Sequence, residues 1–148
     1  MTDPVVASKP LRYHRLPETH FIHRAEMRII TPSPGSGIDA MFELAVTDET
    51  TNGHGGLQGG MTATLIDCAA AAAIRSRVGG EGHYPTQDLV VHYVATLRHG
   101  PARAIARVRK LGARTVVVQV DVVDAGDDDH LCALGTVTFA VLENRTAG

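Results

Sequence analysis

The chain has 148 residues, of which 44% are hydrophobic, 20% charged and 4% aromatic, and its formal net charge is -2. A chain of this length buries about 68–70% of its unfolded surface. The sequence therefore predicts one compact domain and excludes a disordered acidic tail, a collagen-like chain and a disulfide scaffold. With few aromatic side chains for base stacking and no excess of positive charge, we also expect no nucleic-acid partner.

The first half of the domain is predicted from patterning. Residues 1–20 contain prolines and no periodic pattern, which predicts an N-terminal arm before a single domain over residues 21–148. Residues 21–31 could form either a short strand or a short helix, because their pattern does not decide. Residues 38–47 alternate apolar and polar side chains, as a half-buried strand does, and a polar, Gly-rich loop over residues 48–56 follows.

Residues 57–78 are predicted to form one long helix. Gly59-Gly60 opens it and Gly79-Gly80 closes it, which suits the ends of a helix. Between these ends nearly every side chain is apolar or small, including five consecutive alanines. A helix without a polar face is a buried helix. Its small side chains would let a surrounding sheet approach closely.

Four strands are predicted after the helix, each with alternating side chains and each joined to the next by a short link with Gly or Pro. Such links favour antiparallel pairing of successive strands. The predicted strands are residues 87–97, 102–108, 114–123 and 130–142. One strand, one apolar helix and four antiparallel strands make an α+β fold, in which an antiparallel sheet wraps around one long central helix.

The sequence favours a cytoplasmic protein without a membrane partner. The first residues have no apolar stretch of signal-peptide length. The longest apolar run is interrupted by Thr62, Thr64 and Asp67 and is too short to span a bilayer. Cys68 and Cys132 have no CxxC or framework spacing, and both are interpreted as buried small hydrophobic residues rather than catalytic thiols.

The Gly-rich start of the helix is the first candidate for chemistry. Gly59-Gly60 would present unpaired backbone N–H groups at a helix N-terminus, where the dipole favours a negative atom. A phosphate-binding loop would need GxxxxGK[ST] or GxGxxG. Neither fits, because no Lys follows and Gln58 occupies a required Gly position. The other interpretation is an oxyanion hole, in which an N–H polarises a carbonyl.

Asp67 is the second candidate. It lies two turns into the apolar helix, where an ionised carboxylate is unfavourable unless it has hydrogen-bond partners or faces a wet cleft. It could fix the packing by accepting hydrogen bonds from a neighbouring element, or it could act in catalysis, because carboxylates in clefts serve both purposes.

A resemblance to a known family is carried by the segment LQGGMTATLID, which ends at Asp67. It resembles the signature of hotdog-fold acyl-CoA thioesterases of the phenylacetate-degradation (PaaI) type, in which HGG opens the central helix and an acidic residue follows nine positions after the His. Gln58 stands at the His position. Asn52 and Thr86 stand where that family often has a loop Asn and a Ser or Thr. The resemblance covers about residues 38–142 and implies a hotdog fold.

A second HGG begins at His54, in the loop before the helix. Nine residues after it stands Ala63, which can do no acid–base chemistry, and that register would start the helix before Gly59-Gly60. The Gln58 register is therefore preferred. Gln can donate and accept hydrogen bonds but cannot titrate near neutral pH, and whether His54 compensates from the loop stays open.

The resemblance implies an enzyme that hydrolyses the thioester of an acyl-CoA to a carboxylic acid and free CoA. The carbonyl oxygen would bind the Gly60 amide, helped by Gln58. Asp67, reaching across a subunit interface, would attack the carbonyl carbon or activate water. Thr86 could position the water or satisfy the backbone at a strand start, and Asn52 could hold the loop or groups of the partner subunit.

Substrate contacts are predicted from two further places. Gly59 and His54 belong to the same Gly-rich segment as the helix start. A basic stretch without acids places Arg103, Arg107 and Arg109 on one strand face, and arginine matches the phosphates of coenzyme A. The alternative is an ordinary solvated strand face, partly neutralised by nearby acids.

The remaining expectations concern partners and cofactors. Hotdog sites are assembled between two protomers, so the resemblance implies a homodimer, and a homotetramer is a family expectation. No cofactor is expected beyond the CoA of the substrate. No metal is expected, because the acidic residues 127–129 are typical of a turn. The alternative function is a non-catalytic acyl-CoA-binding hotdog protein, acting as a sensor or carrier.

Overall fold

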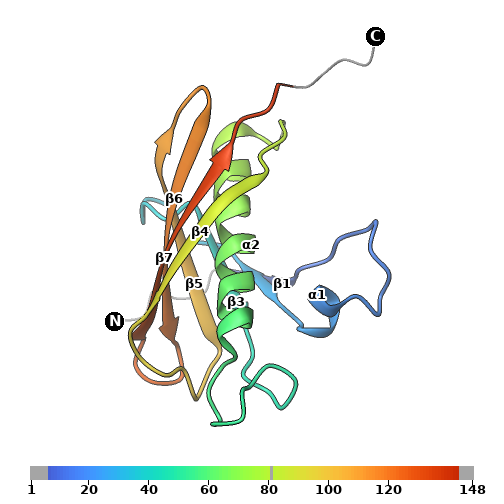
Figure 1. Cartoon of the computed structure of the whole chain (residues 1–148), viewed down its shortest axis with the longest axis vertical. Coiled ribbons are helices and arrows are strands. Elements are labelled where there is room, and N and C mark those ends of the chain that lie inside the picture. Colours follow the sequence, from blue (N-terminus) through green and yellow to red (C-terminus); the bar gives the residue numbers. More distant parts are fainter. Residues whose placement is uncertain (1–6, 81, 144–148) are drawn as a thin grey trace.

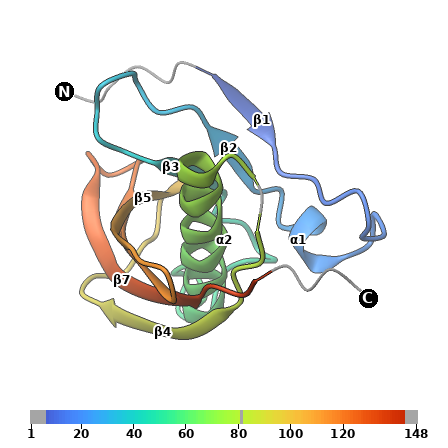
Figure 2. The same cartoon turned by 90° about the horizontal axis from the view of Figure 1, so that it is seen from above.

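The computed structural model describes residues 7–80 and 82–143. Their strands form one antiparallel sheet in the order β1-β2-β3-β5-β6-β7-β4, and the long helix α2 lies against its concave face (Figure 1, Figure 2). The elements are β1 Ser8–Pro10, α1 Phe21–Arg24, β2 Arg28–Ile30, β3 Ala40–Leu44, α2 Gly59–Val78, β4 Thr86–Tyr93, β5 Ala102–Leu111, β6 Thr115–Asp124 and β7 His130–Ala140. The predicted α+β architecture is confirmed.

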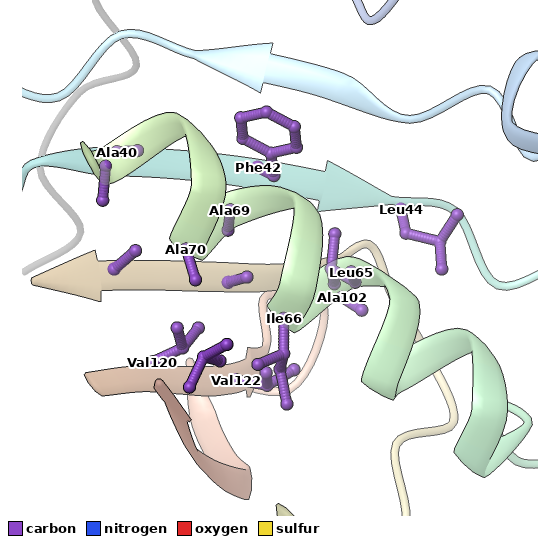
Figure 3. Close-up of a cluster of buried hydrophobic side chains, with 14 of the residues drawn as sticks. Ala40, Phe42, Leu44, Leu65, Ile66, Ala69, Ala70, Ala102, Val120 and Val122 are labelled. Atoms are coloured by element: carbon purple, nitrogen blue, oxygen red, sulfur yellow. The ribbon is translucent and has the colours of Figure 1, made fainter. Parts of the chain in front are cut away.

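Small side chains bring α2 close to the sheet, as predicted. Ala69, Ala70 and Ala73 are fully buried against it, and Figure 3 shows Ala69 and Ala70 on α2 among the buried side chains of the strands. On β7, a Cβ added to Gly135 would lie 2.8 Å from Ile66 Cγ2, so only glycine fits beneath that side chain. The helix ends at Gly79, whose left-handed φ of 76° and N–H bond to the Arg75 carbonyl form a C-cap.

The predicted pairing of successive strands is wrong at one step. β4 does not pair with β5; it pairs with β7 at the edge of the sheet, whereas β5 lies between β3 and β6. The link from β4 to β5 is not a hairpin, because it runs across the ends of β7 and β6. Its Val94 and Ala95 N–H groups donate to the Cys132 carbonyl, and the N–H groups of residues 98–100 donate to the Asp124 carboxylate.

The N-terminal region contributes to the sheet and to the core. Residues 21–31, left undecided between strand and helix, contain both α1 and β2. Within the predicted arm of residues 1–20, Ser8–Pro10 pairs with β2, and Leu11 is buried in the core. No helix in the described part of the chain has the length and apolar character needed to cross a membrane.

Candidate active site

Two backbone N–H groups at the start of α2 have no hydrogen-bond acceptor among the described residues. The Leu57 N–H donates to the Leu97 carbonyl and the Gln58 N–H to the Thr50 carbonyl, both at 2.8 Å. The next two N–H groups, of Gly59 and Gly60, meet no protein acceptor among the described residues. A Cβ added at Gly60 would meet nothing within 4 Å. The Gly60 N–H therefore lies at an open surface, where a carbonyl oxygen can approach it.

The loop before α2 is held by Asn52. Its Oδ1 accepts hydrogen bonds from the His54 N–H at 2.8 Å and the Gly56 N–H at 3.3 Å, a side-chain-closed turn typical of Asn. The guanidinium of Arg98 donates to the His54 carbonyl at 3.0 Å. Asn52 thus holds the loop, and the His54 backbone is part of that support. Gln58 is the N-cap residue, and its side chain makes no capping hydrogen bond.

Asp67 and Thr86 form the second part of the site. The Thr86 hydroxyl donates to Asp67 Oδ1 at 2.8 Å, joining the first residue of β4 to the middle of α2. Asp67 is half-buried and Thr86 is exposed. One carboxylate oxygen is held in place, while Oδ2 has no hydrogen-bond partner in residues 7–80 and 82–143. The contact fixes a carboxylate that still reaches solvent, which suits both a base and a nucleophile.

The two parts of the site are separated along α2 within one chain. Gly60 and Asp67 are seven residues apart, which corresponds to about 10 Å of rise and to nearly the same face of the helix. Reacting atoms need to come within about 3–3.5 Å of each other. The structure therefore brings Asp67 to Thr86, and the loop residues to the helix start, without bringing Asp67 to the Gly60 of the same chain.

Tyr93, at the end of β4, is a site residue that the sequence did not single out. Its hydroxyl donates to the Gly59 carbonyl at 2.6 Å. It also lines a cavity of about 190 Å³ beside the helix start, together with Asn52, Leu57 and Thr62. The packing of β4 along α2 brings this hydroxyl to the first turn of the helix, and the pattern of the strand alone does not indicate that contact.

Neither cysteine is activated. Tyr13 Oη lies 4.0 Å from Cys68 Sγ, and burial raises the pKa of the Cys68 thiol to about 11 and the pKa of Tyr13 to about 12. Burial also raises the pKa of Cys132, which is 3% exposed. A protonated thiol is a poor nucleophile, so both residues serve packing, although Cys68 is only half-buried.

The basic stripe, which consists of Arg103, Arg107 and Arg109 on β5, lies on the side of the sheet that faces away from α2. Ala102, Ala104 and Ala106 are buried on the side of α2, so the alternating Arg103 and Arg107 face away from it. The structure does not bring these arginines to Asp67, and it gives them partners. The contacts are Arg103 Nη2 with Glu43 Oε1 at 2.8 Å, Arg103 Nη1 with Asp129 Oδ1 at 3.3 Å, Arg107 Nη1 with Asp121 Oδ2 at 3.4 Å, and Arg109 Nε with Gln119 Oε1 at 3.0 Å.

Arg103→Ala is expected to destabilise the fold, because it leaves the Glu43 carboxylate unpaired where both side chains are about 15% exposed. The expected loss is about 2 kcal/mol, between the values for exposed and buried pairs. The pair of Arg107 is more exposed, so Arg107→Ala should lose less than about 1 kcal/mol. Urea unfolding measures both. If the stripe binds substrate phosphates, both variants instead raise the KM for an acyl-CoA.

No three potential metal ligands among His, Cys, Asp and Glu lie together in the part of the chain that the structure describes. The carboxylates beside the basic stripe are occupied by the arginines. Asp124 has backbone partners instead.

The sequence and the fold both identify a family. A model of the thioesterase superfamily matches residues 54–130, which is just over half of the chain. The chain belongs to the thioesterase superfamily. Its sheet wrapped around one helix is the hotdog fold of PaaI-like thioesterases, and its general class of chemistry is thioester hydrolysis. No curated protein matches the sequence.

Several solved structures are similar to this one. A conserved protein from Pseudomonas aeruginosa is 28% identical with a TM-score of 0.72, over 82% of this chain and 93% of that one. The phenylacetic acid degradation protein PaaI from Thermus thermophilus, in a mutant form, is 29% identical with a TM-score of 0.67, over 82% and 98%. A protein from Bacillus halodurans crystallised with CoA is 29% identical with a TM-score of 0.62, over 69% and 66%.

Proposed function

We propose that this protein hydrolyses the thioester of an acyl-CoA to a carboxylic acid and free CoA, and that it acts as a homodimer. The observation that carries the proposal is the presence, on one face of α2, of a bare Gly60 N–H and of an Asp67 carboxylate held by Thr86. Membership of the thioesterase superfamily supports the reaction. The CoA in a 29% identical relative supports the substrate class.

The chemistry follows from the two groups. The thioester carbonyl oxygen accepts a hydrogen bond from the Gly60 N–H, which stabilises the negative charge that grows on that oxygen. Gln58, the N-cap residue whose side chain makes no capping hydrogen bond, is the proposed second donor to this oxygen. Asp67 either takes a proton from water as the water oxygen bonds to the carbonyl carbon, or it attacks that carbon itself and water resolves the anhydride. The C–S bond breaks, and the sulfur leaves as CoA.

A dimer resolves the separation of the two groups along α2. A two-fold axis near the middle of the stretch between Gly60 and Asp67 would place the Asp67 of one chain opposite the helix start of the other. An isologous interface does this twice, because each surface meets its own copy. Each dimer would then hold two complete sites.

The edge strand β4 is the surface proposed for this dimer. β4 pairs with β7 on one side only. Its Val90 is 49% exposed, and Val94 just beyond it is 53% exposed. A long, apolar edge strand is a template for pairing with another chain. Antiparallel pairing of two β4 strands would continue the sheet across the dimer and bring the two α2 helices side by side.

Val90→Asp is expected to dissociate the dimer, because it places like charges close together where two edge strands pair. Thr136→Asp is the matched control, since Thr136 is opposite Val90 on β7 and also exposed, but does not lie at the edge. Sedimentation velocity should show wild type and Thr136→Asp as dimers or larger, and Val90→Asp as a monomer with at least tenfold less activity. A monomeric, fully active wild type would contradict the shared site.

A thiol-release assay over a panel of acyl-CoAs, with aliphatic chains of increasing length and aryl groups, tests the function. We expect turnover with at least one member of the panel. Saturable binding measured by calorimetry, with no turnover across the panel, would instead support the binding protein. This second function is the alternative because Gln58 stands at the position where the family has His, and Gln cannot titrate near neutral pH.

A further inference from the structure

Tyr93 contacts the backbone of the proposed oxyanion hole on the side opposite to the Gly60 N–H. Its hydroxyl donates to the Gly59 carbonyl at 2.6 Å, slightly shorter than the usual O–H···O distance of about 2.7–2.8 Å. The Gly59 carbonyl and the Gly60 N–H are the two ends of one peptide unit, and in a trans peptide they point in opposite directions. A contact that fixes the carbonyl therefore also fixes the direction of the N–H.

The hydrogen bond also changes the strength of the donor. A peptide whose carbonyl accepts a hydrogen bond is polarised, and its N–H becomes a better donor. Tyr93 thus acts on the two properties that matter for stabilising an oxyanion, the aim of the N–H and its partial positive charge.

The two glycines at the start of α2 have different surroundings. A Cβ added at Gly59 would lie 3.4 Å from Tyr93 Oη and 3.5 Å from Tyr93 Cζ, whereas a Cβ added at Gly60 would meet nothing within 4 Å. The phenol thus lies in van der Waals contact with the Gly59 position. The absence of a side chain at Gly60 keeps the opposite side clear for a substrate.

The contact is not needed to build the core. The Tyr93 side chain is 56% exposed, at the end of an edge strand, and removing a single hydroxyl from such a position leaves no buried polar group without a partner. A hydroxyl kept at an exposed position, on a carbonyl that already belongs to a helix, is better explained by the peptide that it orients than by stability.

We infer that Tyr93 is a positioning residue for thioester hydrolysis, which holds and polarises the Gly59–Gly60 peptide so that the Gly60 N–H meets the carbonyl oxygen of the substrate. The inference rests on the proposed function. Tyr93 touches no reacting atom; it acts through one peptide unit.

The test is Tyr93→Phe, with Tyr84→Phe as the matched control. Tyr84 lies beside Arg75 near the other end of α2. Loss of a direct oxyanion donor lowers kcat by about 10²–10³-fold, so loss of its orienting contact should lower kcat by about tenfold. The KM should stay within twofold, because the ground-state contacts with the substrate are unchanged. Tyr84→Phe should leave kcat and KM unchanged.

A second readout does not depend on turnover. With glycine labelled at both carbonyl carbon and nitrogen, only Gly-Gly pairs show carbon–nitrogen coupling, and the sequence has three of these, ending at Gly56, Gly60 and Gly80. Tyr93→Phe should move the Gly59 carbonyl and Gly60 amide resonances and leave the pair ending at Gly80 in place. Tyr84→Phe should leave the Gly59–Gly60 pair unmoved.

Each outcome decides the inference. A tenfold loss of kcat together with moved Gly59–Gly60 resonances supports it. Moved resonances with unchanged kcat overturn it and leave the proposed function standing. A loss of kcat with unmoved resonances also overturns it, because the effect would not pass through this peptide. A wild type without turnover on any acyl-CoA rejects the proposed function, and with it the positioning role of Tyr93. A resonance change in Tyr93→Phe would then show only that the contact with Gly59 exists.

Discussion

Asp67→Asn is expected to lower kcat for acyl-CoA hydrolysis by about 10²–10⁴-fold, the usual contribution of a general base. Asn keeps the shape of the side chain, and its carbonyl oxygen still accepts the hydrogen bond that Thr86 donates to Asp67. The fold should therefore persist while proton transfer and nucleophilic attack are lost. Thiol release at saturating substrate measures kcat, and a thermal melt confirms folding.

Asp88→Asn is the control for this prediction. It removes an exposed carboxylate from β4, the strand that begins at Thr86, and should leave kcat unchanged. Thr86→Val keeps Asp67 but removes its hydrogen bond, and about a tenfold loss is expected, since the carboxylate stays charged but less well held. Activity retained in Asp67→Asn would show that Asp67 fixes packing only.

Asp124→Ala should destabilise the protein by about 3–5 kcal/mol, a value typical of breaking a buried charged network. The Asp124 side chain is almost fully buried and accepts hydrogen bonds from four backbone N–H groups, of Arg98, His99, Gly100 and Gly126, at 2.8–3.2 Å. Alanine would leave all four without this acceptor. At about 2–4 °C per kcal/mol for a chain of this size, the melting temperature should fall by roughly 10 °C.

The same carboxylate predicts how stability depends on pH. Burial acts to raise the pKa of Asp124, but the four backbone donors stabilise the anion and hold the pKa below its ordinary value. A lowered pKa in the folded state means that the stabilisation is complete above the unfolded carboxyl pKa of about 3.9 and is lost as the pH falls below it. Wild type should therefore lose more stability between pH 5 and 3 than Asp124→Asn, which cannot titrate at this position.

Asp121→Ala is the control on the same strand, since Asp121 is paired with Arg107 near the surface and should lose less than about 1 kcal/mol. Unchanged urea unfolding in Asp124→Ala would contradict the network. The result also bears on activity, because the segment that Asp124 ties down supplies the Leu97 carbonyl that accepts the Leu57 N–H just before α2. Asp124→Ala is thus expected to loosen the start of the helix as well.

Sequence patterns predicted the parts of the site whose residues lie close together along the chain. The Gly-Gly pair and the acid two turns into the helix lie within the nine residues 59–67, and their chemistry depends mainly on the helix itself. The alternating pattern also predicted the strand that forms β4.

Contacts that depend on which strands become neighbours were not predicted. The position of β4 beside β7 is decided by the link over Cys132 and Asp124, and a short Gly- and Pro-containing link gives no sign of that route. The contact of Tyr93 with Gly59 follows from this position. The acids that pair with the arginines of β5 come from β3, β6 and the turn before β7, and this pairing needs the strand register.

The seven-residue spacing of Gly60 and Asp67 on α2 has a genetic consequence. If each reaction centre takes its oxyanion donor from one chain and its acid from the other, damage to either residue disables both centres of a homodimer. A mixed dimer behaves differently. One chain lacking the acid and one with a blocked helix start would pair to give one centre with both defects and one with neither, so two inactive proteins would restore half of the activity by complementation.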